Sequence, residues 1–265
     1  MLELSQKEYL GERNLLDRGS GGISVVEVEY RNEVFEGWHS HRQPHITLFL
    51  QGGTIEKRKT SERVFGFGDL AFYHGGEPHQ NYKTSFPSKN INLELDEVLL
   101  ERLGITEAMI ERSIADKVSS KLLILKIYHE CLIADELSED TKQMLVAQFA
   151  PGANYFEGFA NCPTWVRSLF EILNDRWHET PKLSELGKVL GLNPITISKH
   201  FPRYFGCSFG EYLRRLKVDQ ALTLIRNGRS SLTQIAHDCG FSDQSHFVRT
   251  FKHQTGFLPR QFQRL

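Results

Sequence analysis

The spacing of apolar residues changes along the chain, and the change predicts two kinds of structure. Between about Gly22 and Leu95 the apolar residues stand in short β-branched or aromatic runs, such as Ile46–Leu50, separated by Gly-rich turns. The alternation of apolar and polar residues over Ile91–Leu95 is typical of a strand with one buried face. Because no helical pattern lies between these runs, we predict an antiparallel barrel or sandwich.

From about Leu99 to Gln148 the apolar residues recur at three- and four-residue spacing, as in amphipathic helices. The stripe consists of Ile110, Ile114, Val118, Leu122 and Leu125. It can pack on the predicted barrel or on a second copy of the chain. We predict a homodimer formed through this stretch, with Ile114 and Leu122 as contacts between the copies.

After a loop at Ala150–Asn154 a further helix is predicted, starting at Asn161–Pro163 with proline near its first position. Two stretches of the remaining chain then repeat one pattern 49 residues apart. The first copy contains Leu183, Leu186, Gly187, Leu190, Gly191, Leu192 and Asn193; the second contains Leu232, Ile235, Ala236, Cys239, Gly240, Phe241 and Ser242. After one extra residue, the match resumes with Phe201, Gly206 and Tyr212 answering Phe251, Gly256 and Phe262.

Each copy has the order of an apolar helix, a Gly-containing turn, a capping residue and a second helix, which is the pattern of a helix-turn-helix. We predict N-caps at Asn193 and Ser242, with Pro194 at the first helical position. Further boundary signals are the capping boxes Ser208/Glu211 and Ser231/Gln234, and Gly228 at the end of the connecting helix. Pro202 departs from the pattern, because a proline inside a helix is expected to kink or end it.

These patterns predict a two-domain protein of 265 residues, a length at which each domain can bury its own core. The predicted fold class is an N-terminal all-β barrel with a helical linker, followed by an all-α domain with two helix-turn-helix units. We place the barrel at residues 1–98, the helical linker and dimerisation region at 99–160, and the DNA-binding domain at 161–265.

The overall charge of −1 hides an uneven distribution. From Pro181 to Leu265 there are 13 Lys and Arg against 5 Asp and Glu, which leaves 19 basic and 28 acidic residues in the rest. A basic C-terminal module favours a polyanionic partner, although two domains that attract each other would show the same asymmetry. Four widely spaced cysteines and the lack of a long apolar run predict reduced thiols in a cytoplasmic protein.

Two strings in the C-terminal region resemble the signature of AraC/XylS-type transcription regulators. One is Cys239–Phe247 with the sequence CGFSDQSHF, followed by Arg249, Phe251, Gly256 and Pro259; the other is Phe205–Leu216 with the sequence FGCSFGEYLRRL. Upstream, Trp38–His41 and Gly68–His79 resemble the two cupin motifs found in the sensor half of this family. The resemblance implies that the second helix of each unit enters the major groove of double-stranded DNA.

The helical pattern indicates which side chains would face that DNA. Ile197 and Phe201 form the core stripe of the first unit, and Phe247 and Phe251 that of the second. Arg and Lys can address guanine, and Gln can address adenine. An ordinary solvated helix face is the alternative. The predicted DNA-binding residues are Ile195, Thr196, Ser198, Lys199, Gln244, Ser245, His246, Arg249 and Lys252.

Histidines mark the candidate metal site. His39, His41 and His45 share one parity, so a continuous strand would point them to one side, although Pro44 weakens that inference. In cupins these positions and that of His79 converge inside the barrel, which implies a site for Zn²⁺, Ni²⁺ or Fe²⁺. The alternative is an effector pocket lined by histidine without metal. His74 stands where the resemblance would place proline.

The leading interpretation is a sequence-specific transcription regulator that responds to a small-molecule or metal effector and is not an enzyme. Such a regulator reads two adjacent major-groove segments, and contacts RNA polymerase if it is an activator. The alternatives are a cupin metalloenzyme tethered to DNA and a constitutive DNA-binding protein without effector. Four histidines with no nearby glutamate predict a closed metal site, which argues against the enzyme.

Overall fold

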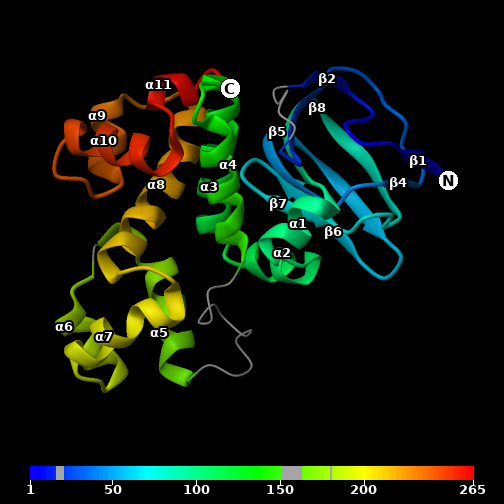
Figure 1. Ribbon diagram of the computed structural model, residues 1–265. Coiled ribbons are helices and arrows are strands. Elements are labelled where there is room, and N and C mark those ends of the chain that lie inside the picture. Colours follow the sequence, from blue (N-terminus) through cyan, green and yellow to red (C-terminus); the bar gives the residue numbers. More distant parts are fainter. Residues whose placement is uncertain (16–20, 151–162, 180) are drawn as a thin grey trace. The chain divides into compact units, whose positions relative to one another are not determined.

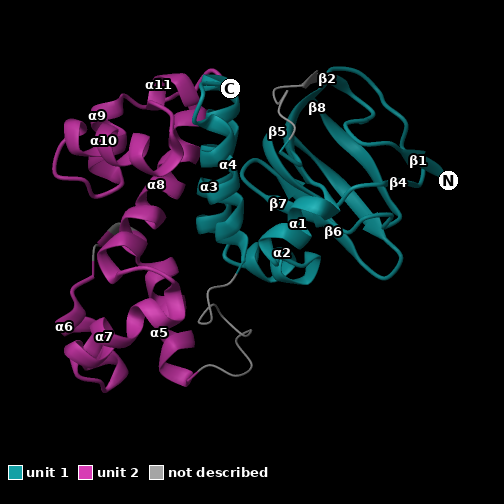
Figure 2. Ribbon diagram, in the orientation of Figure 1, with its two compact units in different colours: residues 1–150 teal, residues 151–265 magenta. Residues whose placement is uncertain are grey.

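The computed structural model describes residues 1–15, 21–150, 163–179 and 181–265. Two compact units divide the chain, residues 1–150 and residues 151–265 (Figure 2). Residues 160 and 161, where we place the start of the DNA-binding domain, lie outside the described residues. The helices from residue 97 to residue 149 belong to the first compact unit. We describe each unit by itself.

The first unit is built on one antiparallel-rich sheet, which confirms the all-β prediction for this part of the chain (Figure 1). Its strands are β1 (Leu2–Leu4), β2 (Glu12–Leu15), β3 (Ile23–Tyr30), β4 (His39–His41), β5 (His45–Arg58), β6 (Glu62–Gly66), β7 (Leu70–Tyr73) and β8 (His79–Leu95). The long strand β8 is central, because it pairs with β3, β4 and β5. Among the described residues the pairings form no closed ring, so the sheet curves without closing into a barrel.

Strand β5 connects the two halves of this sheet. It pairs with β8 over its whole length, with β7 near its start and with β6 near its end. Its side chains alternate between two buried faces, with Ile46 and Leu48 on one and His45, Thr47 and Phe49 on the other. The second of these faces lines a pocket, so the pleat of β5 determines which residues reach it.

The first unit ends in helices α1 (Glu97–Leu103), α2 (Glu107–Ser113), α3 (Lys117–Ile133) and α4 (Ser138–Val146), and the 3₁₀ turn η1 (Ala147–Phe149). The expected helical stretch is therefore present, divided into helices of 7 to 17 residues. Asp96, Thr106 and Asp116 cap α1, α2 and α3 through their side chains. Leu122 is 3 % exposed and Ile114 is half-buried, and their contact with a second copy stays a prediction.

The second unit is all-helical within the described residues. It consists of α5 (Thr164–Asp175), η2 (Trp177–Glu179), α6 (Leu183–Leu190), α7 (Pro194–Phe205), α8 (Phe209–Asn227), α9 (Leu232–Asp238), α10 (Gln244–Thr255) and α11 (Pro259–Phe262). The pairs α6–α7 and α9–α10 are the two predicted helix-turn-helix units, and α8 connects them (Figure 1). Pro163 is the N-cap of α5, and Trp165 of that helix contacts Tyr204 of α7 edge to face.

Most of the predicted helix boundaries are confirmed. Asn193 caps α7 with Pro194 at its first position, and Ser208 and Ser231 accept hydrogen bonds from the backbone N–H groups of Glu211 and Gln234. Gly228 ends α8 with a φ of 65°. The N-cap of α10 is Asp243 and not Ser242, because the Asp243 carboxylate accepts the hydrogen bond from His246 N–H at 2.7 Å.

Pro202 does not end its helix. Helix α7 continues three residues further to Phe205, and the Pro202 carbonyl accepts a hydrogen bond from Gly206 N–H at 3.0 Å. A proline inside a helix leaves the carbonyl four residues earlier without its usual donor, here that of Ser198. Both Pro202 and Ser198 are exposed, so water can donate a hydrogen bond to the Ser198 carbonyl.

No described helix is both long and apolar enough to cross a membrane.

Candidate functional site

The two helix-turn-helix units expose the faces that their sequence predicts. In α7 the side chains of Ile197 and Phe201 are buried, whereas Ser198, Lys199 and Pro202 are exposed. Ile195 and Thr196, in the first turn of α7, are exposed as well. The same face that could contact a partner is therefore apolar at its start and cationic at Lys199.

Helix α10 presents a more polar face than α7. Phe247 and Phe251 are fully buried, and the exposed residues between and around them are Gln244, Ser245, Arg249 and Lys252. His246 is half-buried, with its ring edge-on to Phe241 and its Nδ1 atom 3.1 Å from the Ser242 hydroxyl. These side chains can donate to base edges or phosphates.

Contacts from neighbouring elements hold the start of α10 in place. The Thr233 hydroxyl of α9 donates to Gln244 Oε1 at 2.6 Å, which joins the two helices of the second unit. In the turn between them, the Lys217 ammonium of α8 donates to the Gly240 carbonyl at 2.7 Å and lies over the Phe241 ring. Burial lowers the pKa of Lys217. The turn is therefore fixed by the connecting helix.

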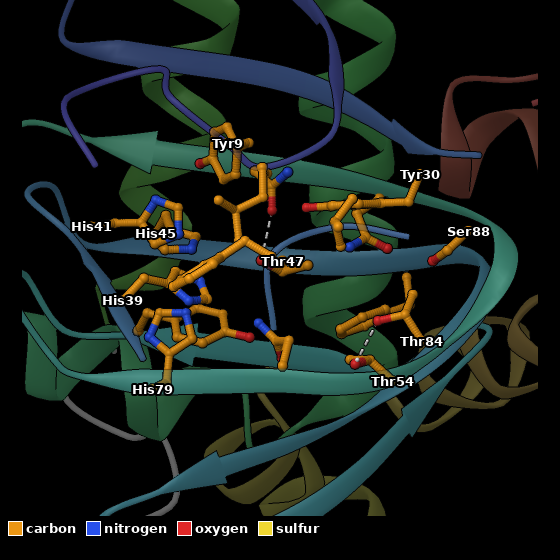
Figure 3. A pocket seen from close by; sticks show the side chains of 18 residues that line it. Tyr9, Tyr30, His39, His41, His45, Thr47, Thr54, His79, Thr84 and Ser88 are labelled. Atoms are coloured by element: carbon orange, nitrogen blue, oxygen red, sulfur yellow. Dashed lines mark hydrogen bonds between the residues drawn. The ribbon is translucent and has the colours of Figure 1, made fainter. Parts of the chain in front are cut away.

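A pocket lies inside the curved sheet of the first unit and encloses about 570 Å³ of empty space, including its opening to solvent. Figure 3 shows four histidines gathered at one end and Thr54, Thr84 and Ser88 at the other. The histidines come from three strands, with His39 and His41 on β4, His45 on β5 and His79 on β8. The pairing of these strands therefore brings His79 close to His39 and His41, which lie far from it in the sequence.

Three of the four predicted histidines form a candidate metal centre. One ring nitrogen from each of His39, His41 and His79 lies within 4.8 Å of the other two, and all three side chains are buried. His39 and His79 face each other directly, because their residues are register partners between β4 and β8. Three imidazoles are a donor set suited to Zn²⁺, Ni²⁺ or Fe²⁺.

Backbone carbonyls fix the tautomer of three of the four histidine rings. The Nδ1 atoms of His39, His45 and His79 lie 3.1, 3.3 and 3.1 Å from the carbonyl oxygens of Gly37, Gln43 and Glu77. Because a carbonyl can only accept, each Nδ1 must carry the hydrogen, which leaves a lone pair on Nε2. In metal sites, a ligating histidine is oriented by a hydrogen bond of this kind from the ring nitrogen that does not bind the metal. His41 Nδ1 is buried without a hydrogen-bond partner, so the cluster also contains an unpartnered nitrogen.

The surroundings keep these rings neutral. Burial is the largest cause that lowers the pKa of His39 and His41, and it lowers the pKa of His45 and of His79 to about 3. The neighbouring histidines lower the pKa values of His41 and His79 further. Neutral imidazoles have the free lone pairs that metal ligation requires.

His45 stands apart from the group of three. Its ring stacks on Tyr73 at a centroid distance of 4.5 Å, and it meets His41 edge to face at 4.5 Å. A site of three histidines would keep a coordination position open, whereas the predicted four-histidine site, which includes His45, would be closed and stays a prediction. Glu56, only 1 % exposed, accepts a hydrogen bond from Tyr73, whose ring contacts both His45 and His79, so Tyr73 connects a buried carboxylate to the histidines.

His74 belongs to a different set of contacts. Its Nδ1 atom lies 2.5 Å from a carboxylate oxygen of Glu107, and its Nε2 atom lies 3.5 Å from one of Glu111, both on α2. The side chain of His74 is about one third exposed. It links the turn after β7 to α2 and takes no part in lining the pocket.

Sequence reasoning missed the polar part of the pocket lining. It is formed by side chains that carry hydroxyl or amide groups: Thr47, Thr54, Asn81, Thr84, Ser88, Asn90 and Asn92. The alternation over Ile91–Leu95 contained part of the signal, because the apolar positions 91, 93 and 95 are core residues and position 92 lines the pocket. Extending that parity backwards along the strand reaches Asn90 and Ser88.

Comparison with known proteins agrees with the geometry of the second unit. A family model described as a helix-turn-helix domain matches residues 186–265. The second unit therefore contains a helix-turn-helix domain. An HTH-type transcriptional activator named RhaS, from Escherichia fergusonii, is 30 % identical to the chain over 105 residues, which is 40 % of this chain and 38 % of the activator.

Other relatives match more of this chain. An uncharacterized HTH-type transcriptional regulator of Staphylococcus aureus is 28 % identical over 191 residues, 67 % of this chain and 24 % of the relative. The match thus spans about a quarter of that protein's length. Among solved structures, ToxT from Vibrio cholerae covers 91 % of this chain and 98 % of its own at 10 % identity, with a TM-score of 0.38. The C-terminal domain of AraT from Geobacillus stearothermophilus covers 40 % of this chain and 88 % of its own at 22 % identity, with a TM-score of 0.37.

Proposed function

We propose that this protein is a sequence-specific, DNA-binding transcription regulator whose first unit responds to a metal ion or a small molecule. The observation that carries the proposal is the pair of helix-turn-helix units, each with a buried apolar stripe and an exposed face that carries a basic side chain. The excess of basic residues from Pro181 to Leu265 supports a polyanionic partner. The naming of the matched relatives as transcription regulators points the same way.

The proposal assigns different tasks to the exposed residues of α7 and α10. Arg249 and Lys199 would address guanine, and Gln244 would address adenine or a backbone phosphate. Ile195, at the start of α7, would contact a thymine methyl group. Thr196, Ser198, Ser245, His246 and Lys252 complete the proposed interface through phosphates or base edges.

In the first unit, His39, His41 and His79 would hold a divalent transition metal. Two features support this: the Nδ1 hydrogens of His39 and His79 are bonded to carbonyls, and His41 Nδ1 is buried without a partner. A bound metal would supply a positive charge and an open coordination position facing the pocket. His45 would contribute as a neighbour of His41 and not as a ligand of the same group.

A second candidate function follows from the number of histidines that converge. Because three ligands leave a position open, a metalloenzyme attached to DNA is favoured more by the geometry than by the sequence. Metal analysis combined with an oxygen-uptake screen distinguishes the two. Uptake that depends on the metal and is lost in His79→Ala would favour the enzyme. Bound metal without turnover would favour the regulator, which we propose is not an enzyme.

The proposal also includes a homodimer on paired DNA sites and, for an activator, a contact with RNA polymerase. Sedimentation equilibrium of the full chain with and without operator DNA measures the first of these. A monomer in both conditions would contradict the dimer without affecting DNA recognition, because each chain already carries two helix-turn-helix units.

Two titrations test the regulator. Gel shifts with promoter fragments and random DNA should show a preference for at least one promoter, and no preference would contradict the proposal. Zn²⁺ and Ni²⁺ should then be titrated with and without that operator, for the wild type and His41→Ala. Thermodynamic reciprocity demands that metal and DNA change each other's affinity by one factor. His74→Ala, outside the cluster, is the matched control.

A further inference from the structure

Helix α8 contacts α7 and α10, the second helices of the two helix-turn-helix units, through neighbouring residues. The ring of Tyr212 meets those of Phe201 and Phe205 on α7 edge to face, at centroid distances of 5.7 and 5.0 Å. The preceding residue, Glu211, accepts a hydrogen bond from Nε2 of Gln254 on α10 at 2.7 Å. One turn of α8 therefore holds both helices that carry the predicted DNA-binding residues.

Helix α10 is attached to α8 near both of its ends. Just before α10 starts, the Lys217 ammonium donates to the Gly240 carbonyl at 2.7 Å. Near the end of α10, Gln254 donates to Glu211. Lys217 and Glu211 are separated by about 9 Å along α8, because an α-helix rises about 1.5 Å per residue. Two separated attachments fix the direction of α10, whereas one attachment alone would let it pivot.

The hydrogen bond between Gln254 and Glu211 joins a buried amide to a charged group. Gln254 is only 3 % exposed. Burial alone would raise the pKa of Glu211, but the hydrogen bonds from Gln254 and Arg214 outweigh it and lower that pKa. Arg214 donates to Oε2 of Glu211 at 2.7 Å, and Gln254 donates to Oε1. Hydrogen bonds to a charged group are stronger than those between neutral groups, so this one can hold α10 in place.

We propose that the hydrogen bond between Gln254 and Glu211 fixes the spacing between the two DNA segments that α7 and α10 read. Both are positioning residues, because they act through the direction of α10 and not by touching DNA. Without the bond, α10 would pivot about the Lys217 contact and accept neighbouring spacings. The inference rests on the proposed function, because it requires that both helices read DNA.

The geometry of DNA makes spacing a sensitive measure of this bond. One added base pair moves a segment by about 3.4 Å along the DNA and turns it by about 35° around the axis. Two helices held in one arrangement cannot follow both changes without losing contacts. A helix that pivots can follow part of them.

The test is a selection by the full chain from duplex DNA with about 30 random base pairs, a length that contains two segments one turn apart. Sequencing the bound DNA gives the preferred bases in each segment and the number of base pairs between the segments. The wild type should enrich one spacing. Gln254→Met should enrich the same bases at two or more neighbouring spacings. In competition gel shifts, its preference for the wild-type spacing over one longer by a base pair should be about tenfold smaller than that of the wild type.

Gln234→Met is the matched control. The Gln234 amide also donates to a carboxylate, that of Asp238 at 2.6 Å, but both residues are exposed and lie on α9. This variant should keep the wild-type spacing. Glu211→Gln should keep it too, because its amide oxygen can still accept from Gln254.

Glu211→Ala removes the same bond from the more exposed side, since the Glu211 side chain is 21 % exposed. It should widen the spacing as Gln254→Met does, and it carries the test if Gln254→Met does not fold, which circular dichroism measures.

The outcomes separate this bond from DNA recognition itself. A single unchanged spacing in Gln254→Met or, if that variant does not fold, in Glu211→Ala would overturn the inference. A wider spacing in Gln234→Met, or a loss of base preference together with the spacing in Gln254→Met, would make the effect one of general stability and overturn it as well. If the wild type enriched no sequence at all, the proposed regulator would be contradicted, and the inference would fall with it.

Discussion

The two helix-turn-helix units share a backbone and differ in the surface that they present. In both turns the same hydrogen bond recurs, from Leu192 N–H to the Gly187 carbonyl and from Phe241 N–H to the Ala236 carbonyl, each at 2.9 Å. Both turns also contain a left-handed glycine, Gly191 and Gly240, with φ of 66° and 69°. The repeat in the sequence is therefore a repeat of backbone geometry.

The exposed faces have diverged. Helix α7 carries the exposed apolar Ile195 in its first turn and Lys199 further on, whereas α10 begins with Gln244 and carries Arg249 and Lys252. Burial of Phe201 and Phe251 at equivalent positions is complete in both. The core and the turn of each unit must pack in the same way, so they are alike in the two units. The exposed residues are not constrained by this packing, so they can differ and contact different DNA bases.

The largest effect is expected from the shared core. Phe201→Ala and Phe251→Ala should each lower the free energy of unfolding by about 3–5 kcal/mol, because both rings are fully buried. Urea denaturation followed by circular dichroism measures this. Ile195→Ala, at a side chain that is 74 % exposed, is the control and should change the free energy of unfolding by less than about 0.5 kcal/mol. A large loss in only one of the two units would show that they are not packed alike.

The turns should differ at Gly187 and Ala236, which occupy matching positions. A Cβ atom at Gly187 would lie 2.6 Å from the Leu192 carbonyl oxygen, so Gly187→Ala should destabilise the protein by about 1–3 kcal/mol. The reverse change, Ala236→Gly, should destabilise it by about 1 kcal/mol through helix propensity alone. If Gly187→Ala stabilised the protein, as alanine in a helix usually does, the close approach would be contradicted.

DNA binding should distinguish the two surfaces. Arg249→Ala and Lys199→Ala should each weaken operator binding by about 1–3 kcal/mol and relax the base preference at one position. Competition binding against operators with single base changes measures this at fixed salt. Unchanged preference with a shallower salt dependence would instead make the residue a phosphate contact.

The smallest effect is expected from the caps of the two recognition helices, Asn193 and Asp243. Asn193→Ala should lower the free energy of unfolding by about 1 kcal/mol at any pH. The backbone N–H of His246 and the Ser242 hydroxyl lower the pKa of Asp243. A lowered pKa in the folded state means that this stabilisation is present above the ordinary aspartate pKa and is lost as the pH falls through the folded value. Chemical denaturation at neutral and acidic pH should therefore show a pH-dependent loss for Asp243→Ala only.

The sequence by itself determined the helical unit in detail. A buried face such as Ile197–Phe201, a glycine at the end of a helix and a side chain that caps three residues ahead are local features, because their partners lie within one or two turns. The N-cap of α10, which we predicted at Ser242, is the neighbouring residue Asp243. Parity along one strand likewise determined that His39 and His41 share a face.

Only the tertiary structure decided which residues meet in the pocket. The His39, His41 and His79 rings converge because β8 pairs with β4, while His45 on β5 turns toward Tyr73. Asn81 and Asn90 of β8 are nine residues apart, and both line the pocket. Convergence of this kind depends on sheet register and curvature, which arise from contacts between segments that are distant in sequence. The period of the apolar residues predicts the strands but not which of their polar side chains come together.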